Sequence, residues 1–314
     1  MRCLYCYQEL ADIEKDFHPA CSKNIFGQPT PPELPFTEKE MEELALKVIR
    51  SQVTVTGVQP KLSLDIQKTE GTNEPKRFTI VGLFGNYILK PPTQQYPHLP
   101  EIEDLTMHLA SIVKIKTVPH SLIRMQSGEL AYITKRIDRN KKNKLHMEDF
   151  CQLTEQLTEH KDRGSYEQIA KAIHKYSANP GLDVVNFYEQ VLFSFLTGNA
   201  DMHLKNFSLL HNPTLGPVLA PAYDMVATKL LIRDDNEEMS LHLKGKKNRL
   251  SRKDFIAAFT LARLDSKQQT NIFKKMEKAV PAWMNFIDIS FMSDEYKGLL
   301  KEIINERFNR VIFQ

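Results

Sequence analysis

Hydrophobic and polar residues alternate with a period of two in much of the first half of the chain, which is typical of β-strands. Short strands are predicted at residues 53–56, 62–66, 78–81, 87–90 and 131–134. One segment in this half, about 101–114, instead has its apolar residues three to four positions apart and is predicted to be helical. Another helix is expected to begin at Thr37, because Thr37 and Glu40 have the spacing of a capping box. The first half is therefore expected to form a small sheet with a packed helix.

Beyond about residue 146 the apolar positions recur every three to four residues, so the second half is expected to be mainly helical. The predicted helices lie near 148–161, 165–177, 183–198, 251–263, 266–279 and 295–312. Loops and short strands are expected to alternate between residues 199 and 226. The pattern indicates an α+β protein with two lobes. Its predicted parts are a short Cys/His module (1–34), a sheet-containing lobe (35–137) and a helical lobe (138–314).

Composition narrows the classes of function. The chain has 314 residues, 41% of them hydrophobic, and a formal net charge of +3. That charge is too small to indicate nucleic-acid binding by itself. No stretch approaches the roughly 20 apolar residues that a membrane helix needs, and the N-terminus turns acidic where a signal peptide is apolar. A cytoplasmic protein without membrane contact is expected.

Three of the four cysteines lie close to the N-terminus. Cys3 and Cys6 form one pair, while His18 and Cys21 form another, each with two residues between its members. This number and spacing of ligands is typical of a structural zinc site. Buried thiols that only fill space are the alternative, and the sequence leaves both open. Cys151 stands alone and is expected to be a packing residue.

The most informative segment runs from Gly198 to Phe207 and follows an apolar helix. Asp201 and Asn206 are five residues apart, which matches the catalytic loop of protein kinases. An aspartate there accepts the proton of the attacking hydroxyl, and an asparagine supplies a neutral oxygen to Mg²⁺. Lys205 is placed to offset charge on the transferred phosphoryl group. The alternative is an ordinary turn aspartate at position 201.

Other polar residues follow in the order that a kinase requires. Asp224, eighteen residues beyond Asn206, is expected to be the second magnesium ligand. Lys90 ends a predicted strand and is expected to reach the nucleotide phosphates, while Glu103 opens the next helix and is placed to pair with it. The alternative is that Lys90 is an exposed lysine at the end of a strand and that Glu103 is an acidic first-turn residue stabilised by the helix dipole.

These motifs together resemble those of the HipA-like serine/threonine kinases of bacterial toxin–antitoxin systems, over about residues 50–312. The matching motifs are Gly57-Val58-Gln59-Pro60-Lys61, Tyr87-Ile88-Leu89-Lys90, Glu103 before Met107-His108-Leu109-Ala110, Lys135-Arg136-Ile137-Asp138-Arg139, Glu148-Asp149-Phe150-Cys151-Gln152, Gly198 to Phe207, and Tyr223-Asp224. Their order along the chain is that of the family.

The resemblance implies a two-lobed, protein-kinase-like fold and a role for each matched residue. Asp201 would be catalytic with Lys205, and Asn206 and Asp224 would bind Mg²⁺. Lys90, held by Glu103, would bind the phosphates of ATP, the backbone around Lys135 to Ile137 would hold adenine, and Asp138 would lie near the ribose. The other residues expected to contact ATP are His203 and, in a loop that would cover the phosphates, Thr56, Gly57, Val58 and Gln59. A structural role for His203, bridging the loop to the body of its lobe, is the alternative. Thr54 and Thr56, with Ser51 behind them, are the autophosphorylation candidates.

The resemblance also implies substrates and partners. Family substrates are aminoacyl-tRNA synthetases, such as the tryptophanyl and glutamyl enzymes. The chain lacks the subdomain that precedes the kinase core in full-length members, so it is most like the shortened HipT form of three-component systems. Its expected partners are a small HipS-like protein and a helix-turn-helix HipB-like antitoxin, with DNA bound only through the antitoxin. An inactive kinase fold that serves as a binding partner and a small-molecule phosphotransferase are the alternatives.

Overall fold

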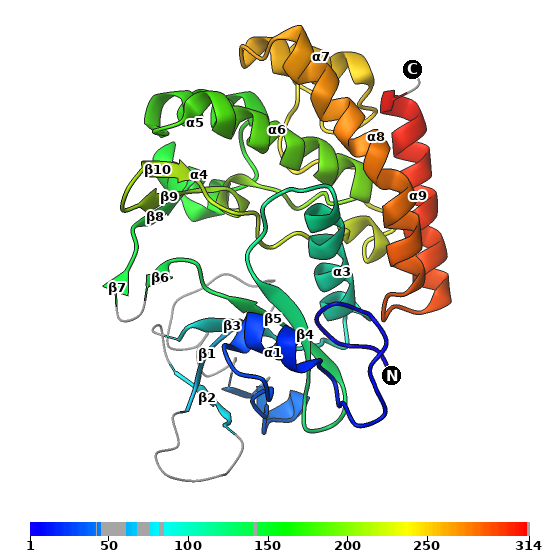
Figure 1. The fold of residues 1–314 in the computed structure, drawn as a ribbon. Coiled ribbons are helices and arrows are strands. Elements are labelled where there is room, and N and C mark those ends of the chain that lie inside the picture. The colour runs from blue at the N-terminus through cyan, green and yellow to red at the C-terminus, as the bar shows by residue number, and fades with distance from the viewer. Residues whose placement is uncertain (42, 45–60, 68–75, 82–84, 141–142, 313–314) are drawn as a thin grey trace. The chain divides into compact units, whose positions relative to one another are not determined.

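The computed structural model describes residues 1–41, 43–44, 61–67, 76–81, 85–140 and 143–312 (Figure 1). Contacts divide the chain into two compact units. The first unit comprises Met1–Asp104, Val118–Ile137 and Ile289–Phe291, and the second comprises Leu105–Thr117, Asp138–Asp288 and Met292–Gln314. The predicted strand at 53–56 and most of the helix that begins at Thr37 lie outside the described residues.

The first unit contains a five-stranded antiparallel sheet with the strand order β2-β1-β3-β5-β4. The strands are β1 (Leu62–Ile66), β2 (Phe78–Ile80), β3 (Tyr87–Lys90), β4 (His120–Arg124) and β5 (Leu130–Lys135). All four predicted strands that fall on described residues are confirmed. The edge strand β4 was not predicted, because four of its five residues are buried and no alternation marks it.

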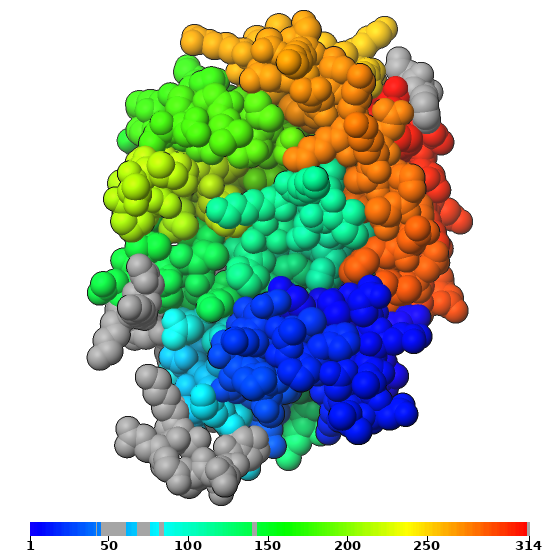
Figure 2. Space-filling view, in the orientation of Figure 1, coloured from blue at the N-terminus to red at the C-terminus, as the bar shows by residue number. Residues whose placement is uncertain are grey.

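Residues 1–34 belong to this first unit and pack against its sheet. Helix α1 (Pro19–Phe26) brings the ring of Phe26 to 5.8 Å from that of Phe78 and 6.1 Å from that of Tyr87. The hydroxyl of Tyr87 donates to the carbonyl of Ile25 at 3.1 Å. In the space-filling view the N-terminal residues (blue) lie directly beside the strand residues coloured cyan (Figure 2). The Cys/His segment is thus part of the hydrophobic core of the sheet.

The capping box at Thr37 is present. The N–H of Thr37 donates to Oε2 of Glu40 at 2.8 Å, and the N–H of Glu40 donates to Oγ1 of Thr37 at 3.4 Å. The predicted helix start is therefore confirmed. The other helix predicted in this half is α3 (Leu99–Ile112), and the boundary between the two units falls within it.

The second unit is mainly helical. Its α-helices are α4 (Phe150–Leu153), α5 (Tyr166–Tyr176), α6 (Pro180–Thr197), α7 (Arg252–Leu261), α8 (Ser266–Asp288) and α9 (Asp294–Ile312). A three-stranded sheet is formed by β8 (Met147–Asp149), β9 (Ser208–Asn212) and β10 (Gly216–Leu219), and a small hairpin by β6 (Arg139–Asn140) and β7 (Asn143–Lys144). Single turns of 3-10 helix occur at η1 (Thr158–His160), η2 (Leu204–Asn206) and η3 (Thr228–Leu230).

Helix α6 forms the centre of this unit. Every residue from Phe187 to Thr197 is buried, as expected for a helix that is apolar on all sides. The ring of Phe193 lies 5.6 Å from that of Trp283 in α8, and the guanidinium of Arg307 in α9 donates to the carbonyl of Phe195 at 2.6 Å. The C-terminal end of α6, where the candidate catalytic loop begins, is therefore rigidly held.

Two predicted helices differ from those observed. The helix predicted at 148–161 is wrong, because this segment forms the strand β8, the single turn α4 and the turn η1. Asp149 caps α4 by accepting from the N–H of Gln152 at 2.9 Å, and Glu155 then adopts a left-handed φ of 56° that ends the turn. Helix α8 continues beyond the predicted end at 279, past Pro281, to Asp288. Among the described helices, none is both long and apolar enough to span a bilayer.

Candidate active site

The candidate catalytic loop begins at Gly198, the residue that ends α6. Its φ is +76°, a left-handed conformation that favours glycine. A Cβ atom here would lie 3.1 Å from Ile303 Cγ2 and 3.1 Å from Lys229 Cβ. Both the backbone conformation and the space therefore require glycine, and the chain turns sharply from the buried helix into the polar segment.

Asp201 and Asn206, the predicted catalytic pair, are joined by a hydrogen bond. The side-chain amide Nδ2 of Asn206 donates to the main-chain carbonyl of Asp201 at 2.8 Å. Since a carbonyl only accepts, this bond fixes the orientation of the amide and directs its oxygen Oδ1 away from the carbonyl of Asp201. The carboxylate of Asp201 is 60% exposed, whereas Asn206 is buried. The loop thus combines one exposed carboxylate with one buried amide whose orientation is fixed.

Buried aromatic side chains and main-chain groups hold the candidate catalytic loop in place. The hydroxyl of Tyr166 donates to the carbonyl of Met202 at 3.1 Å, and the N–H of Leu204 donates to the carbonyl of Lys161 at 3.1 Å. The ring of Phe207, which follows the loop, packs 5.0 Å from that of Phe187 in α6. These contacts keep the loop conformation independent of the Asp201 side chain.

Asp224 lies on a neighbouring segment that is tied to the same loop. Its φ of 57° is left-handed, which is uncommon for a residue other than glycine. The adjacent Tyr223 is half-buried, and desolvation of its hydroxyl raises the pKa of that group. This hydroxyl donates to the carbonyl of Lys205 at 3.0 Å. Farther along, the N–H of Lys229 donates to the carbonyl of Gly198 at 3.0 Å. The loop and the Asp224 segment therefore form one rigid piece of the second unit.

His203 lies close to Asp201, with its Nε2 3.9 Å from Oδ1 of Asp201. Burial, together with the positive charge of Lys161, lowers the pKa of His203 to about 4, although Asp162 and Asp224 oppose this shift. The imidazole is therefore neutral at physiological pH. Its burial agrees with the structural role that the sequence left as an alternative.

The neutral imidazole of His203 leads to a pH-dependent stability. Its pKa of about 4 lies below the ordinary 6.5, so between these values the unfolded chain binds the extra proton and stability rises with pH. The contribution is complete above about pH 6.5 and is lost towards pH 4, at up to about 1.4 kcal/mol per pH unit. We expect the melting temperature to fall more between about pH 7 and pH 5 for the parent chain than for His203→Gln. Parallel calorimetric profiles would contradict this assignment.

Asp162 is a residue of this region that the sequence did not single out. Its carboxylate, that of Asp201 and a nitrogen of His203 offer ligand atoms that all lie within 4.8 Å of one another. The hydroxyl of Ser240 donates to Oδ1 of Asp162 at 2.9 Å. Asp162 falls between the helices predicted at 148–161 and 165–177, and the run Asp162-Arg163-Gly164 is a usable sequence signal for a polar loop there.

The first unit holds the predicted pair of Lys90 and Glu103. Lys90 is the last residue of β3, and its Nζ lies 2.5 Å from Oε1 of Glu103 in α3. Both side chains are buried, at 4% and 0% exposure, and the ammonium lies 5.5 Å from the ring centroid of Tyr132. The predicted pairing is confirmed. A carboxylate in this position holds the lysine in a single orientation.

The neighbour of Glu103, Asp104, fixes the same turn of α3. Its Oδ2 accepts from the hydroxyl of Tyr7 at 2.8 Å, and its Oδ1 lies 2.6 Å from Nδ1 of His120 on β4. Tyr7, Asp104 and His120 are all buried. The backbone that carries Glu103 is thus connected both to the sheet and to the N-terminal segment.

The predicted adenine- and ribose-contacting residues lie at the end of β5 and just beyond it. The N–H groups of Lys135 and Arg136 donate to the carbonyls of Pro119 and Asn86, at 2.9 and 2.8 Å. These two amides are therefore committed within the first unit, which makes Ile137 the amide of this segment to consider for adenine. Asp138, in the second unit, is buried and accepts from Nη1 of Arg139 at 2.8 Å.

Lys205 and the phosphate-covering loop complete the predicted set. Burial raises the pKa of Asp149, and the ammonium of Lys205 opposes that shift, so Lys205 lies within electrostatic reach of this carboxylate. The remaining predicted residues, Ser51, Thr54, Thr56, Gly57, Val58 and Gln59, lie outside the described residues.

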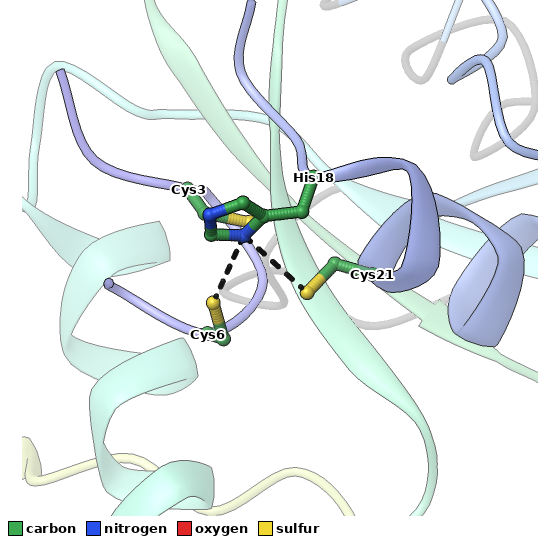
Figure 3. A group of neighbouring side chains, drawn as sticks. All are labelled: Cys3, Cys6, His18 and Cys21. Atoms are coloured by element: carbon green, nitrogen blue, oxygen red, sulfur yellow. Dashed lines mark hydrogen bonds between the residues drawn. The ribbon is translucent and has the colours of Figure 1, made fainter. Parts of the chain in front are cut away.

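The structure also brings together the four residues of the predicted zinc site. Cys3, Cys6, His18 and Cys21 point toward one another in the first unit, as Figure 3 shows. Cys151 is buried in the second unit, as expected of a packing residue.

Sequence comparisons identify one matching family and several related proteins. The profile of the HipA-like C-terminal domain matches residues 53–284. A putative kinase of Haemophilus influenzae is 32% identical over 209 residues, covering 62% of this chain and 58% of that protein. The putative kinase Y4dM of Sinorhizobium fredii is 32% identical over 218 residues, covering 65% and 52%. The serine/threonine-protein kinase toxin HipA of Shewanella oneidensis is 25% identical over 207 residues, covering 58% and 44%. The chain thus spans about half the length of these relatives.

Solved structures show the same fold. HipA from Shewanella oneidensis, in a complex with HipB and operator DNA, superposes with a TM-score of 0.69 at 21% identity, covering 91% of this chain and 75% of that one. The proinflammatory kinase CtkA of Helicobacter pylori gives 0.54 at 17% identity, covering 72% and 88%. The chain therefore has their mixed α and β, kinase-like fold, with a β-sheet lobe and a helical lobe. The predicted fold class is confirmed.

Proposed function

Because the chain belongs to the HipA-like C-terminal domain family, we propose that it is an ATP-dependent serine/threonine protein kinase. The observation that carries this proposal is the Asp201–Asn206 loop, in which Asp201 has an exposed carboxylate and its main-chain carbonyl fixes the orientation of the Asn206 amide. The relatives at 32% identity are named putative kinases, which supports the same reaction class. The proposed functional parts keep the boundaries expected from the sequence: 1–34, 35–137 and 138–314.

The residues present suit magnesium and the phosphates of ATP. Asn206 offers a neutral oxygen and Asp224 a carboxylate, and such oxygen ligands are the ones that Mg²⁺ prefers. Asp224 adopts a left-handed backbone conformation, which functional sites often retain because the conformation serves the site. When bound, Mg²⁺ neutralises charge on the phosphate oxygens. Asn206 and Asp224 are the residues proposed to hold it.

Each of the other residues of the candidate site has a proposed role in phosphoryl transfer. Asp201 orients the substrate hydroxyl and accepts its proton, and Lys205 offsets negative charge on the transferred group. Lys90, oriented by Glu103, is proposed to bind nucleotide phosphates. The amide of Ile137 is proposed to contact adenine and Asp138 the ribose. Residues 56–59 are proposed to cover the phosphates.

The physiological role we propose is that of a toxin in a toxin–antitoxin system. The substrate would be an aminoacyl-tRNA synthetase, such as the tryptophanyl or glutamyl enzyme, whose phosphorylation inhibits translation in the cytoplasm. The structural relative from Shewanella oneidensis is bound to HipB and operator DNA, which supports an antitoxin partner of that kind. A small HipS-like protein is the other proposed partner. Autophosphorylation at Thr54 or Thr56 would place a phosphate near those of ATP and switch the kinase off by repulsion.

A transfer assay tests the proposal. The purified chain is incubated with Mg²⁺, γ-labelled ATP and a panel of aminoacyl-tRNA synthetases, followed by phosphoamino-acid analysis and peptide mapping. We expect phosphoserine or phosphothreonine in one synthetase, and phosphate at Thr54 or Thr56 of the kinase itself. Absence of label from every protein would reject the protein-kinase assignment. Label that appears only in an added small molecule would indicate a small-molecule phosphotransferase instead.

A further inference from the structure

Three thiols and one imidazole converge in the N-terminal part of the first unit (Figure 3). Cys3 and Cys6 lie on one turn, His18 directly precedes α1, and Cys21 lies in the first turn of that helix. One ligand atom from each of the four residues can be chosen so that all lie within 4.8 Å of one another. The two halves of the cluster are therefore brought together by the fold from positions well separated in sequence.

The distances within the cluster suit a tetrahedral metal ion. Nδ1 of His18 lies 3.4 Å from the Sγ atom of Cys6 and 3.7 Å from that of Cys21. In a tetrahedral zinc site with Zn–S of about 2.3 Å and Zn–N of about 2.0–2.1 Å, the sulfur–nitrogen separation is about 3.6 Å. The two observed separations lie on either side of this value, so only small movements would be needed around an ion.

The imidazole of His18 has the tautomer that metal binding requires. Its Nε2 lies 3.0 Å from the main-chain carbonyl of Glu9. A carbonyl only accepts, so Nε2 carries the proton and Nδ1 directs a lone pair at the thiols. Metal-binding histidines commonly donate their second nitrogen to a carbonyl or carboxylate in this way.

The backbone around the first pair of cysteines is held in an uncommon conformation. Tyr7, the residue after Cys6, has a φ of 63° although it is a bulky aromatic residue. Its N–H donates to the carbonyl of Cys3 at 2.9 Å, and the N–H of Cys3 donates to the carbonyl of Gln8 at 2.8 Å. This tight turn places both thiols on one side. Strained conformations persist where the surrounding structure enforces them.

We propose that Cys3, Cys6, His18 and Cys21 bind a single Zn²⁺ ion as a structural site. Thiolate and imidazole ligands in a tetrahedral set select zinc among the common divalent ions. Four protein ligands leave no open position for a substrate, so the ion stabilises the fold and takes no part in catalysis.

The site secures the attachment of the N-terminal segment to the rest of the first unit. Tyr7 directly follows the ligand Cys6, and its hydroxyl donates to Asp104 in α3. On the other side, the carbonyl of Leu4, which lies between the first two ligands, accepts from the N–H of Leu122 in β4 at 3.3 Å. Zinc would thus fix the turn from which both contacts extend, and this role does not depend on kinase activity.

Metal content tests the proposal directly. Elemental analysis of protein purified without a metal-affinity column should find about one zinc ion per chain. Cys6→Ser and Cys21→Ser should each lose most of it, whereas Cys151→Ser, the matched control at the remaining cysteine, should keep it. A parent chain without zinc after growth in zinc-supplemented medium would overturn the proposal, as would full zinc retention in both ligand variants.

A spectroscopic test covers the case in which the ligand variants do not fold. Cobalt substituted into the parent chain should show the visible absorption of tetrahedral Co²⁺ and thiolate-to-cobalt charge transfer, and His18→Cys should retain the metal with a shifted spectrum. Removal of the ion should raise hydrogen exchange in residues 1–26 and in the first turns of α3, while α6 stays protected. Octahedral cobalt bands, or exchange unchanged by chelation, would reject the site.

Discussion

Replacement of Asp201 by asparagine is expected to lower the rate of phosphoryl transfer by about 10²–10⁴-fold, the usual contribution of a positioned base. Asparagine has nearly the shape of aspartate but does not take up the proton of the attacking hydroxyl. The bonds that join Asp201 to Asn199, His203 and Asn206 use its main-chain atoms. The substitution should therefore leave the loop conformation in place, and the loss should appear in kcat.

Three measurements separate loss of the base from other causes. The melting temperature and the affinity for ATP of Asp201→Asn should remain close to those of the parent. Asp162→Asn removes a neighbouring negative charge from the same group of side chains and should lower transfer far less. Equal losses in the two variants would indicate that the two carboxylates act together on a cation. Transfer at the parent rate in Asp201→Asn would remove the base assignment altogether.

Disruption of the Lys90–Glu103 pair is expected to have the largest effect on stability. In Glu103→Leu the buried ammonium of Lys90 loses the carboxylate that lies 2.5 Å away. Loss of one partner of a buried ion pair typically costs about 3–5 kcal/mol, because the remaining charge stays buried without the attraction of that partner. The double variant Lys90→Met/Glu103→Leu should recover most of this stability, since apolar pairs often replace buried ion pairs at little cost. It should still fail to bind ATP normally.

Unfolding of the first unit has to be followed by a probe that lies in that unit. Trp283, the single tryptophan, lies in the second unit, so its fluorescence follows that unit. Hydrogen exchange in β3 and β5 is the suitable measure for the first unit. The exposed pair of Arg77 and Glu33, with side chains 56% and 49% exposed, provides a matched control. Arg77→Met should cost about 0–1 kcal/mol. Comparable losses at the buried and exposed pairs would contradict the electrostatic explanation.

The strands of the first unit show which elements a local sequence pattern can predict. Those with alternating or β-branched residues were predicted within about one residue at each end. The missed strand β4 is buried along almost its whole length, so its sequence lacks the alternation that marks a half-exposed strand. The wrong helix at 148–161 failed for a different reason. Asp149 and Gln152 form a true capping box, but the helix that they begin lasts a single turn.

Some residues of the candidate site could likewise be predicted from the sequence, and others could not. The Asp201–Asn206 pair could be predicted from the sequence because its two residues are five positions apart. A hydrogen bond between them stabilises the loop. The pairing of Lys90 with Glu103 followed from the order of a strand and the next helix. Asp162 was missed because only packing brings it to His203 and Asp201.

The sequence by itself determined most of the strands and helices, the Asp201–Asn206 spacing and the spacing within each Cys/His pair, because each depends on neighbours within a few residues. Tertiary structure alone decided which polar groups are buried, which carboxylate from a distant segment lies near Asp201 and His203, and how far the pKa of His203 is lowered. These properties depend on desolvation and on partners from distant segments. Short-range patterns carry no information about such surroundings.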